Sequence, residues 1–173
     1  YAMTALTAIT AQNTRGVQGV EPLPPHFVLD QVASCLSDIG ADAIKIGMLG
    51  SPETATLLAE RLDTFAGPIV FDPVMVATSG DRLLDSDAEA SLVVRLLPLA
   101  TLITPNLHEA AILVGEPVET VGHMSEAARR LVALGAGAAL IKGGHLGGDV
   151  VDVLWDGDEE SVWRRPRIQT AHT

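Results

Sequence analysis

The sequence is poor in cysteine and in aromatic residues. Cys35 is its single cysteine, which excludes an internal disulfide and a metal cage built from cysteines. One unpaired thiol fits a reducing compartment, and we predict a cytoplasmic protein. Aromatic residues make up 3% of the chain, so alanine, valine, leucine and isoleucine must fill most of the core. Such small side chains are typical of layered helix and sheet packing.

Basic residues are half as numerous as acidic ones. The 11 Lys and Arg residues and the 22 Asp and Glu residues give a formal net charge of −11, which would repel a phosphate backbone. The densest basic stretch contains Arg164, Arg165 and Arg167, and its interruption by Pro166 favours a solvated strand edge. No apolar run is long enough to cross a bilayer, and the first twelve residues carry no basic leader. We therefore predict no nucleic-acid partner, no signal peptide and no membrane span.

The hydrophobic pattern alternates between strand and helix periodicity. A chain of 173 residues with 47% hydrophobic content suits one domain, 1–173. The expected strands are 2–10, 42–48, 68–71, 101–104 and 138–141, and the expected helices are 27–36, 51–65, 88–97, 106–113 and 125–134. The runs 150–155 and 161–165 predict an antiparallel hairpin. The order predicts an α/β fold with a doubly wound, mostly parallel sheet, helices on both faces and a late β-hairpin.

Polar or glycine-rich segments follow four of the expected strands. In an open α/β sheet, ligands bind beyond the carboxyl ends of the strands. The segments are Lys45 to Met48, Asp72 to Met75, Thr104 to Glu109 and Lys142 to His145. We expect them to line one cleft.

The segment from Asn106 to Glu109 has two interpretations. An Asn followed three residues later by Glu is the pattern of a capping box, and spacing alone favours this interpretation. Alternatively, Glu109 and Asn106 hold a hydrated Mg²⁺, which prefers one or two carboxylates plus phosphate oxygens and water. The two roles are compatible, since a helix N-terminus also favours anions.

The other polar candidates are equally open. Asp72 could turn the chain or act on a metal through water. Lys142 could close a turn, or it could neutralise a transferred phosphate where Gly143 lets the backbone come close. His145 fits a loop as well as it fits a proton carrier.

Three further residues could contact a flat ring. The amide of Gln12 offers a donor and an acceptor side by side, as an aminopyrimidine edge requires, although it could simply end a strand. Met48 and Val74 could form apolar walls, but core packing is the favoured interpretation of both. Spacing therefore predicts a nucleotide-type pocket and leaves its substrate open.

Five blocks of sequence resemble one enzyme family in order and spacing. They are TALTAITAQNTRGVQGV (4–20), KIGML (45–49), DPVMVATSGDRLL (72–84), LITPNLHEAAIL (102–113) and IKGGHL (141–146). The chain is similar in these blocks to the hydroxymethylpyrimidine/phosphomethylpyrimidine kinases of thiamine biosynthesis, in the ribokinase superfamily. Five ordered blocks are more specific than any one motif.

This resemblance implies a ribokinase-like phosphotransferase. The expected reactions are ATP-dependent phosphorylation of 4-amino-5-hydroxymethyl-2-methylpyrimidine, followed by phosphorylation of the monophosphate to the diphosphate. ATP is the expected co-substrate and Mg²⁺ the expected cofactor. Family members often dimerise, so a homodimer is also expected.

The resemblance also implies roles for the candidate residues. Gln12 would hydrogen-bond the pyrimidine, with Met48 and Val74 flanking it. The residues expected to organise nucleotide phosphates and metal are Asp72, Asn106, Glu109, Lys142 and Gly143. Among them, Glu109 and Asp72 are the expected metal ligands, and Lys142 would contact phosphate.

Two parts of the family pattern fall outside residues 1–173. Family members begin with a glycine-rich strand and turn, and they continue past the hairpin with a Gly-Thr-Gly-Cys-type loop and helices that form an anion hole. We therefore expect the catalytic base just beyond Thr173, assign no catalytic residue, and expect the sequence to be part of a longer chain. Whether residues 1–173 are active by themselves is left open.

Two other functions compete with this one. A pyridoxal or pyridoxine kinase of the same superfamily would use similar metal and phosphate residues on a pyridine. A catalytically silent nucleotide-binding protein would share the fold without the reaction. A Rossmann dehydrogenase is disfavoured, because no Gly-x-Gly-x-x-Gly pattern follows any expected strand.

Overall fold

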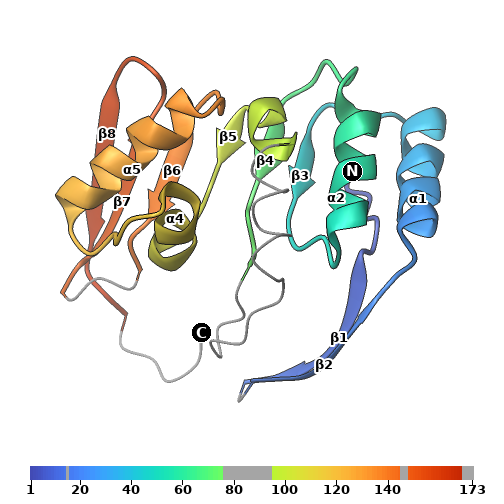
Figure 1. The fold of residues 1–173 in the computed structure, drawn as a ribbon, viewed down its shortest axis with the longest axis horizontal. Helices are drawn as coiled ribbons and strands as arrows, with labels where there is room; N and C mark the ends of the chain where they lie inside the picture. The colour runs from blue at the N-terminus through green and yellow to red at the C-terminus, as the bar shows by residue number, and fades with distance from the viewer. Residues whose placement is uncertain (15, 76–94, 145–147, 169–173) are drawn as a thin grey trace.

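The main feature of the computed structural model is a six-stranded sheet (Figure 1). The structure describes residues 1–14, 16–75, 95–144 and 148–168. In sheet order, the strands are β3 (Ile44–Ile46), β4 (Ile69–Phe71), β5 (Leu102–Ile103), β6 (Ala139–Lys142), β7 (Val150–Trp155) and β8 (Glu160–Arg165). The pairs from β3 to β6 are parallel, whereas β6–β7 and β7–β8 are antiparallel. The predicted mostly parallel α/β sheet with a late hairpin is therefore confirmed.

Helices lie between most of the strands. They are α1 (Pro25–Asp38), which joins β2 to β3, and α2 (Pro52–Leu62), α4 (Leu107–Val114) and α5 (Val121–Ala133), which lie between parallel strands, together with a 3₁₀ turn, η1 (Leu97–Leu99). Because the strands β3 to β6 follow one another in chain order, right-handed crossovers place α2, α4 and α5 over the same face of the sheet. These three helices therefore form a single layer on that face. None of the helices in the described ranges has the length and apolar character needed to span a membrane.

Capping residues explain where two of the helices begin. Ser51 is the extended residue directly before α2, and its hydroxyl accepts a hydrogen bond from the Thr54 amide at 3.1 Å. The helix α2 therefore begins at Pro52, as predicted. The helix α5 begins at residue 121 rather than at the predicted 125. The reason is Thr120, whose hydroxyl accepts from the His123 amide at 3.1 Å and caps the helix earlier.

The C-terminal end of the helix predicted over 88–97 differs from the prediction. Residues 88–94 lie outside the described part of the chain. Beyond them, residues 97–99 form the turn η1, which contains Pro98. Proline lacks the amide that would continue an α-helix, which accounts for the tighter turn.

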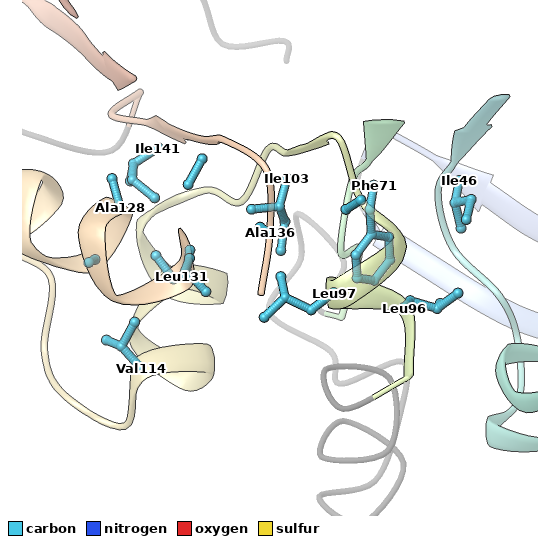
Figure 2. Packing of buried hydrophobic residues seen from close by; sticks show 14 of the residues in the cluster. Ile46, Phe71, Leu96, Leu97, Ile103, Val114, Ala128, Leu131, Ala136 and Ile141 are labelled. Carbon is cyan, nitrogen blue, oxygen red and sulfur yellow. The ribbon is translucent and has the colours of Figure 1, made fainter. Parts of the chain in front are cut away.

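The two faces of the sheet differ in burial. The register places Ile46 beside Phe71, Phe71 beside Ile103, and Ile141 beside Val153, and all five side chains are buried. Leu131 and Ala128 of α5 point toward the same cluster (Figure 2). Burying each large aliphatic or aromatic side chain contributes about 1.5–3 kcal/mol. As the composition predicts, this cluster is dominated by aliphatic residues.

The alternate positions of the strands face the other way. The register pairs Lys45 with Val70, Val70 with Leu102, and Leu140 with Leu154 on this second face of the sheet. The four apolar residues of these pairs are only partly buried, and Lys45 is exposed. The charged residues at the strand ends therefore lie next to a less covered apolar surface.

The N-terminal region forms a separate two-stranded ribbon. Strands β1 (Ala8–Asn13) and β2 (Gly16–Pro22) pair antiparallel, with an irregularity between Ala11 and Gln12 (Figure 1). The prediction of one buried strand over 2–10 is wrong: β1 starts at Ala8, most of its residues are exposed, and its partner was not predicted. Alternating apolar residues suit a ribbon as well as a core strand, and only tertiary contacts distinguish them.

The base of the ribbon is attached to the body of the molecule. The Thr7 hydroxyl donates to the Met48 carbonyl oxygen at 2.7 Å, in the segment that follows β3. The Leu6 amide donates to Gln31 Oε1 in α1, and Gln31 Nε2 donates back to the Leu6 carbonyl oxygen, both at 3.0 Å. These bonds place the beginning of β1 beside the carboxyl end of β3.

Candidate functional site

The carboxyl ends of the parallel strands bring the predicted segments to one edge of the sheet. The Asp72 amide, just after β4, donates to the Ile46 carbonyl oxygen of β3 at 2.8 Å. Across β5 and β6, Asn106 forms a parallel bridge with Lys142, whose amide donates to the Pro105 carbonyl oxygen at 2.9 Å. The residues at these strand ends are therefore neighbours, as expected from the topology.

Asp72 lies between two lysines at this edge. Its Oδ1 atom is 2.8 Å from Lys142 Nζ, and its Oδ2 atom is 3.4 Å from Lys45 Nζ. The Asp72 side chain is 18% exposed, compared with 41% for Lys142 and 67% for Lys45. The contact with Lys142 is thus the shorter and the better shielded one. Each carboxylate oxygen has its own cationic partner.

Glu109 and Asn106 form a capping box at the start of α4. The Asn106 amide donates to Glu109 Oε2 at 2.8 Å, and the Glu109 amide donates to Asn106 Oδ1 at 2.9 Å. The interpretation favoured by spacing is therefore confirmed. Capping uses the single side-chain oxygen of Asn106 and one of the two carboxylate oxygens of Glu109. A role of these residues toward a metal or a nucleotide stays a prediction.

Glu109 is a buried acid, with 3% of its surface exposed. Burial is the main cause that raises its pKa, and the negative charge of Asp72 acts in the same direction. Hydrogen bonds from the amides of Asn106 and Met75 and the positive charge of Lys142 oppose this shift of the pKa. The carboxylate charge is therefore incompletely compensated by the protein, and a bound cation would favour the ionised form.

The carboxylates fit a magnesium ion that shares its coordination with phosphate. Within the described residues, no group of three or more His, Cys, Asp or Glu side chains could hold a metal. A cage made only of protein ligands is therefore absent from that part of the chain. Mg²⁺ usually keeps several waters and binds through one or two carboxylates plus substrate phosphates, which matches the donors that Asp72 and Glu109 offer.

Gly143 is required by packing between β6 and β7. A side chain at this position would overlap the Val151 carbonyl oxygen and come within 2.9 Å of the Met124 methyl group. Its amide donates to Asp152 Oδ1 at 3.1 Å. The sequence patterns did not reveal this steric role, because Val151 and Met124 approach only in three dimensions. Its contact with phosphate stays a prediction.

The residues predicted to contact the ring lie on two different parts of the molecule. Met48 and Val74 are partly buried and follow β3 and β4, and the Val74 amide donates to the Asp72 carbonyl oxygen at 2.8 Å. Gln12 is exposed in β1, opposite Val17 of β2. The ribbon that carries Gln12 starts beside Met48, but among the described contacts none joins Gln12 to Asp72.

Arg167 has a role that sequence analysis missed. Its Nη1 atom donates to the Gly144 carbonyl oxygen at 2.7 Å and its Nε atom to the Gly148 carbonyl oxygen at 3.1 Å. The guanidinium therefore joins two points of the connection between β6 and β7. The basic stretch that contains this residue predicts a solvated strand edge, because no periodic signal marks a long-range side-chain contact. His145, in the same connection, lies outside the described residues.

A shallow groove of about 370 Å³ lies on α1. It is lined by Thr4, Phe27, Asp30, Gln31, Ser34 and Cys35. None of these residues is a predicted site residue, so the groove does not change the location of the candidate site.

The sequence matches a known family along its whole length. A family model described as phosphomethylpyrimidine kinase matches residues 1–173. A hydroxymethylpyrimidine/phosphomethylpyrimidine kinase of Streptomyces coelicolor is 49% identical over 151 residues, which are 87% of this chain and 56% of that protein. The chain thus spans little more than half the length of this relative.

Two solved structures are similar in fold. A phosphomethylpyrimidine kinase from Clostridium difficile superposes with a TM-score of 0.86 and 39% identity, over 95% of this chain and 71% of that chain. A Bacillus subtilis pyridoxal kinase in complex with ADP gives a TM-score of 0.88 and 38% identity, over 98% of this chain and 66% of that chain. The fold is therefore shared by a phosphomethylpyrimidine kinase and a pyridoxal kinase.

Proposed function

The chain belongs to the phosphomethylpyrimidine kinase family, and on this basis we propose that the protein phosphorylates a hydroxymethylpyrimidine with ATP. A first transfer would act on 4-amino-5-hydroxymethyl-2-methylpyrimidine, and a second would convert its monophosphate to the diphosphate for thiamine biosynthesis. The observation that carries the proposal is the charged cluster at the sheet edge, where Asp72 contacts Lys142 and lies near Glu109, whose pKa is raised mainly by burial and also by the negative charge of Asp72. Phosphoryl transfer depends mainly on such alignment and charge stabilisation.

The two transfers differ in their acceptor atoms. In the first, a bond forms between the hydroxymethyl oxygen and the γ-phosphorus, the bond from that phosphorus to the β,γ-bridging oxygen breaks, and the hydroxyl proton must pass to a base. In the second, the acceptor is a phosphate oxygen that is already ionised near neutral pH. We assign the base to none of the described residues, and our expectation that it follows Thr173 stays part of the proposal.

Residues at the carboxyl ends of β5 and β6 would bind the donor phosphates. Lys142 supplies a positive charge, and Asn106 stands at the N-terminus of α4, where backbone amides favour anions. Glu109 and Asp72 would hold Mg²⁺, which when bound compensates negative charge on phosphate oxygens. Glu109 suits this role because burial raises its pKa, so that a bound cation would favour its ionised form. The amide of Gly143 already donates to Asp152. We therefore propose that the lack of a side chain at Gly143 lets a phosphate come close to the backbone.

Residues at the β3 side would hold the acceptor ring. Met48 and Val74 are partly buried at the same strand ends as Lys45 and Asp72, which suits apolar contacts to a flat ring. The amide of Gln12 would pair with the aminopyrimidine edge once the ribbon lies over the acceptor. The attachment of the ribbon at Met48 supports this arrangement.

Phosphorus NMR tests the proposed reaction directly. The complete gene product is mixed with MgATP and the pyrimidine monophosphate, and the expected result is a pyrophosphate signal from the pyrimidine diphosphate. A parallel sample with pyridoxal tests the alternative favoured by the similarity to the ADP complex of a pyridoxal kinase. Transfer to pyridoxal alone would move the assignment to vitamin B6 metabolism. Transfer to neither acceptor would leave a catalytically silent nucleotide-binding protein.

We also propose where and in what form the protein works. The free thiol of Cys35 fits the reducing cytoplasm, where ATP is available. We expect a homodimer from the family resemblance, and light scattering of the complete gene product would measure its mass in solution.

A further inference from the structure

The two lysines of this chain contact the same carboxylate. Of the 11 Lys and Arg residues, only Lys45 and Lys142 are lysines, and both contact the carboxylate of Asp72. All other permanent side-chain cations are arginines. A lysine ammonium is a compact charge on a flexible stem, which can move between a carboxylate and a phosphate without a fixed geometry. This concentration indicates that both lysines serve the site.

The sheet order separates the two lysines. Lys45 belongs to β3, Asp72 follows β4, and Lys142 ends β6, beyond β5. The backbone of Lys142 forms a parallel β-bridge with that of Asn106, on the side proposed for the donor phosphates. Lys45 stands three residues before Met48, on the side proposed for the acceptor. The two cations therefore flank Asp72 at the donor end and at the acceptor end.

Lys45 is the more available of the two. Its ammonium is 3.4 Å from Asp72 and its side chain is 67% exposed, whereas the Lys142 contact measures 2.8 Å. Exposed ion pairs contribute little to stability, so Lys45 can turn from Asp72 to another anion at little cost.

The second transfer creates a need for such a cation. Its acceptor already carries a phosphate with up to two negative charges, which must lie near the carboxylates of Asp72 and Glu109. Donor phosphates would occupy Lys142, leaving the acceptor phosphate without compensation at the β3 end. We propose that Lys45 binds the phosphate of the monophosphate acceptor and so determines specificity for the second transfer. This inference rests on the proposed function.

Calorimetric binding without nucleotide separates this role from a structural one. The complete gene product and its Lys45→Met variant are titrated with the hydroxymethylpyrimidine and with its monophosphate. Loss of one charge-assisted contact should weaken binding of the monophosphate by about tenfold, and binding of the unphosphorylated pyrimidine by less than about twofold. In steady-state assays, KM for the monophosphate should rise while the first transfer is nearly unchanged.

Two further variants control for charge. Lys45→Arg keeps a cation and should restore most of the monophosphate affinity. Arg61→Met removes an exposed charge from the last turn of α2 and should leave both affinities unchanged. Equal losses for both ligands, or no loss, in Lys45→Met would overturn the inference while the proposed function stands. If the unsubstituted protein binds and phosphorylates neither pyrimidine, the proposed function fails first and the inference with it.

Discussion

The ammonium group of Lys142 lies 2.8 Å from Oδ1 of Asp72, which precedes it by 70 positions in the sequence. The two residues come from the ends of β6 and β4, with β5 between them. Their contact therefore depends on the order of the strands in the sheet. It joins the cation proposed for phosphate to the carboxylate proposed for metal.

Replacing Asp72 by Asn should separate activity from stability. We expect turnover to fall by about a hundredfold, because the site loses a carboxylate between two lysines. The free energy of unfolding should change by less than about 1 kcal/mol, since both lysines are substantially exposed. Steady-state kinetics and urea unfolding measure the two effects. A larger loss of stability, shared by Lys142→Met, would instead make this ion pair a structural one.

Replacing Glu109 by Gln should lower activity and should remove the pH dependence of stability that Glu109 causes. The folded protein raises the pKa of Glu109 above the ordinary value of 4.5, so the ionised form is less favourable in the folded than in the unfolded state. The stability associated with this group is therefore full below the unfolded pKa and is lost as pH rises through the folded pKa. The neutral amide of the variant cannot ionise and would escape this loss.

Unfolding experiments between pH 4 and neutral pH check the sign. Relative to the unsubstituted protein, Glu109→Gln should gain stability as pH rises above about 4.5, with no further change once the native Glu109 is fully ionised. Turnover with MgATP should fall by about tenfold or more, because the carboxylate proposed for the metal is gone. A variant that loses stability with rising pH would show that Glu109 is stabilised in its ionised form.

Asn106→Ala and Thr120→Ala compare two helix caps. Asn106 caps α4 at the candidate site, whereas Thr120 caps α5. Each substitution should cost about 1 kcal/mol in the free energy of unfolding, because one amide at a helix start loses its acceptor. Only Asn106→Ala should also weaken ATP binding, measured by calorimetry. Equal nucleotide affinities in the two variants would limit Asn106 to capping.

Gly143→Ala and Gly144→Ala compare adjacent glycines. A methyl group at position 143 would overlap the Val151 carbonyl oxygen, but at position 144 it would meet nothing within 4 Å. We expect Gly143→Ala to destabilise the protein by about 2 kcal/mol and Gly144→Ala by much less. Thermal unfolding compares the two variants. Similar unfolding temperatures would mean that β6 and β7 adjust freely to the added methyl group.

Local sequence patterns predicted the elements and several of their boundaries. Ser51 and Pro52 marked the start of α2, and the spacing of Asn106 and Glu109 marked the capping box of α4. These signals are local because a cap joins groups only three residues apart. Thr120 is a signal of the same kind, and hydrophobic periodicity without this cap predicts a start of α5 four residues too late.

The sequence could not reveal how the elements of the site pack together. The alternating residues before Gln12 suggested a core strand, although β1 belongs to an exposed ribbon. The need for glycine at position 143 depends on Val151, and the contact of Arg167 with Gly144 spans 23 positions. Each of these features results from the approach of segments that are distant in sequence, which periodicity does not encode.

The order of residues is enough to establish which side chains follow the strands, and so which of them are available at the sheet edge. Backbone sterics and short-range hydrogen bonds suffice for that, because they act within a few residues. The folded arrangement is needed to establish that Lys45 and Lys142 share one carboxylate and that Glu109 is buried beside it. Strand order and core packing bring these charges together, and their mutual distances and burial set the electrostatics of the site.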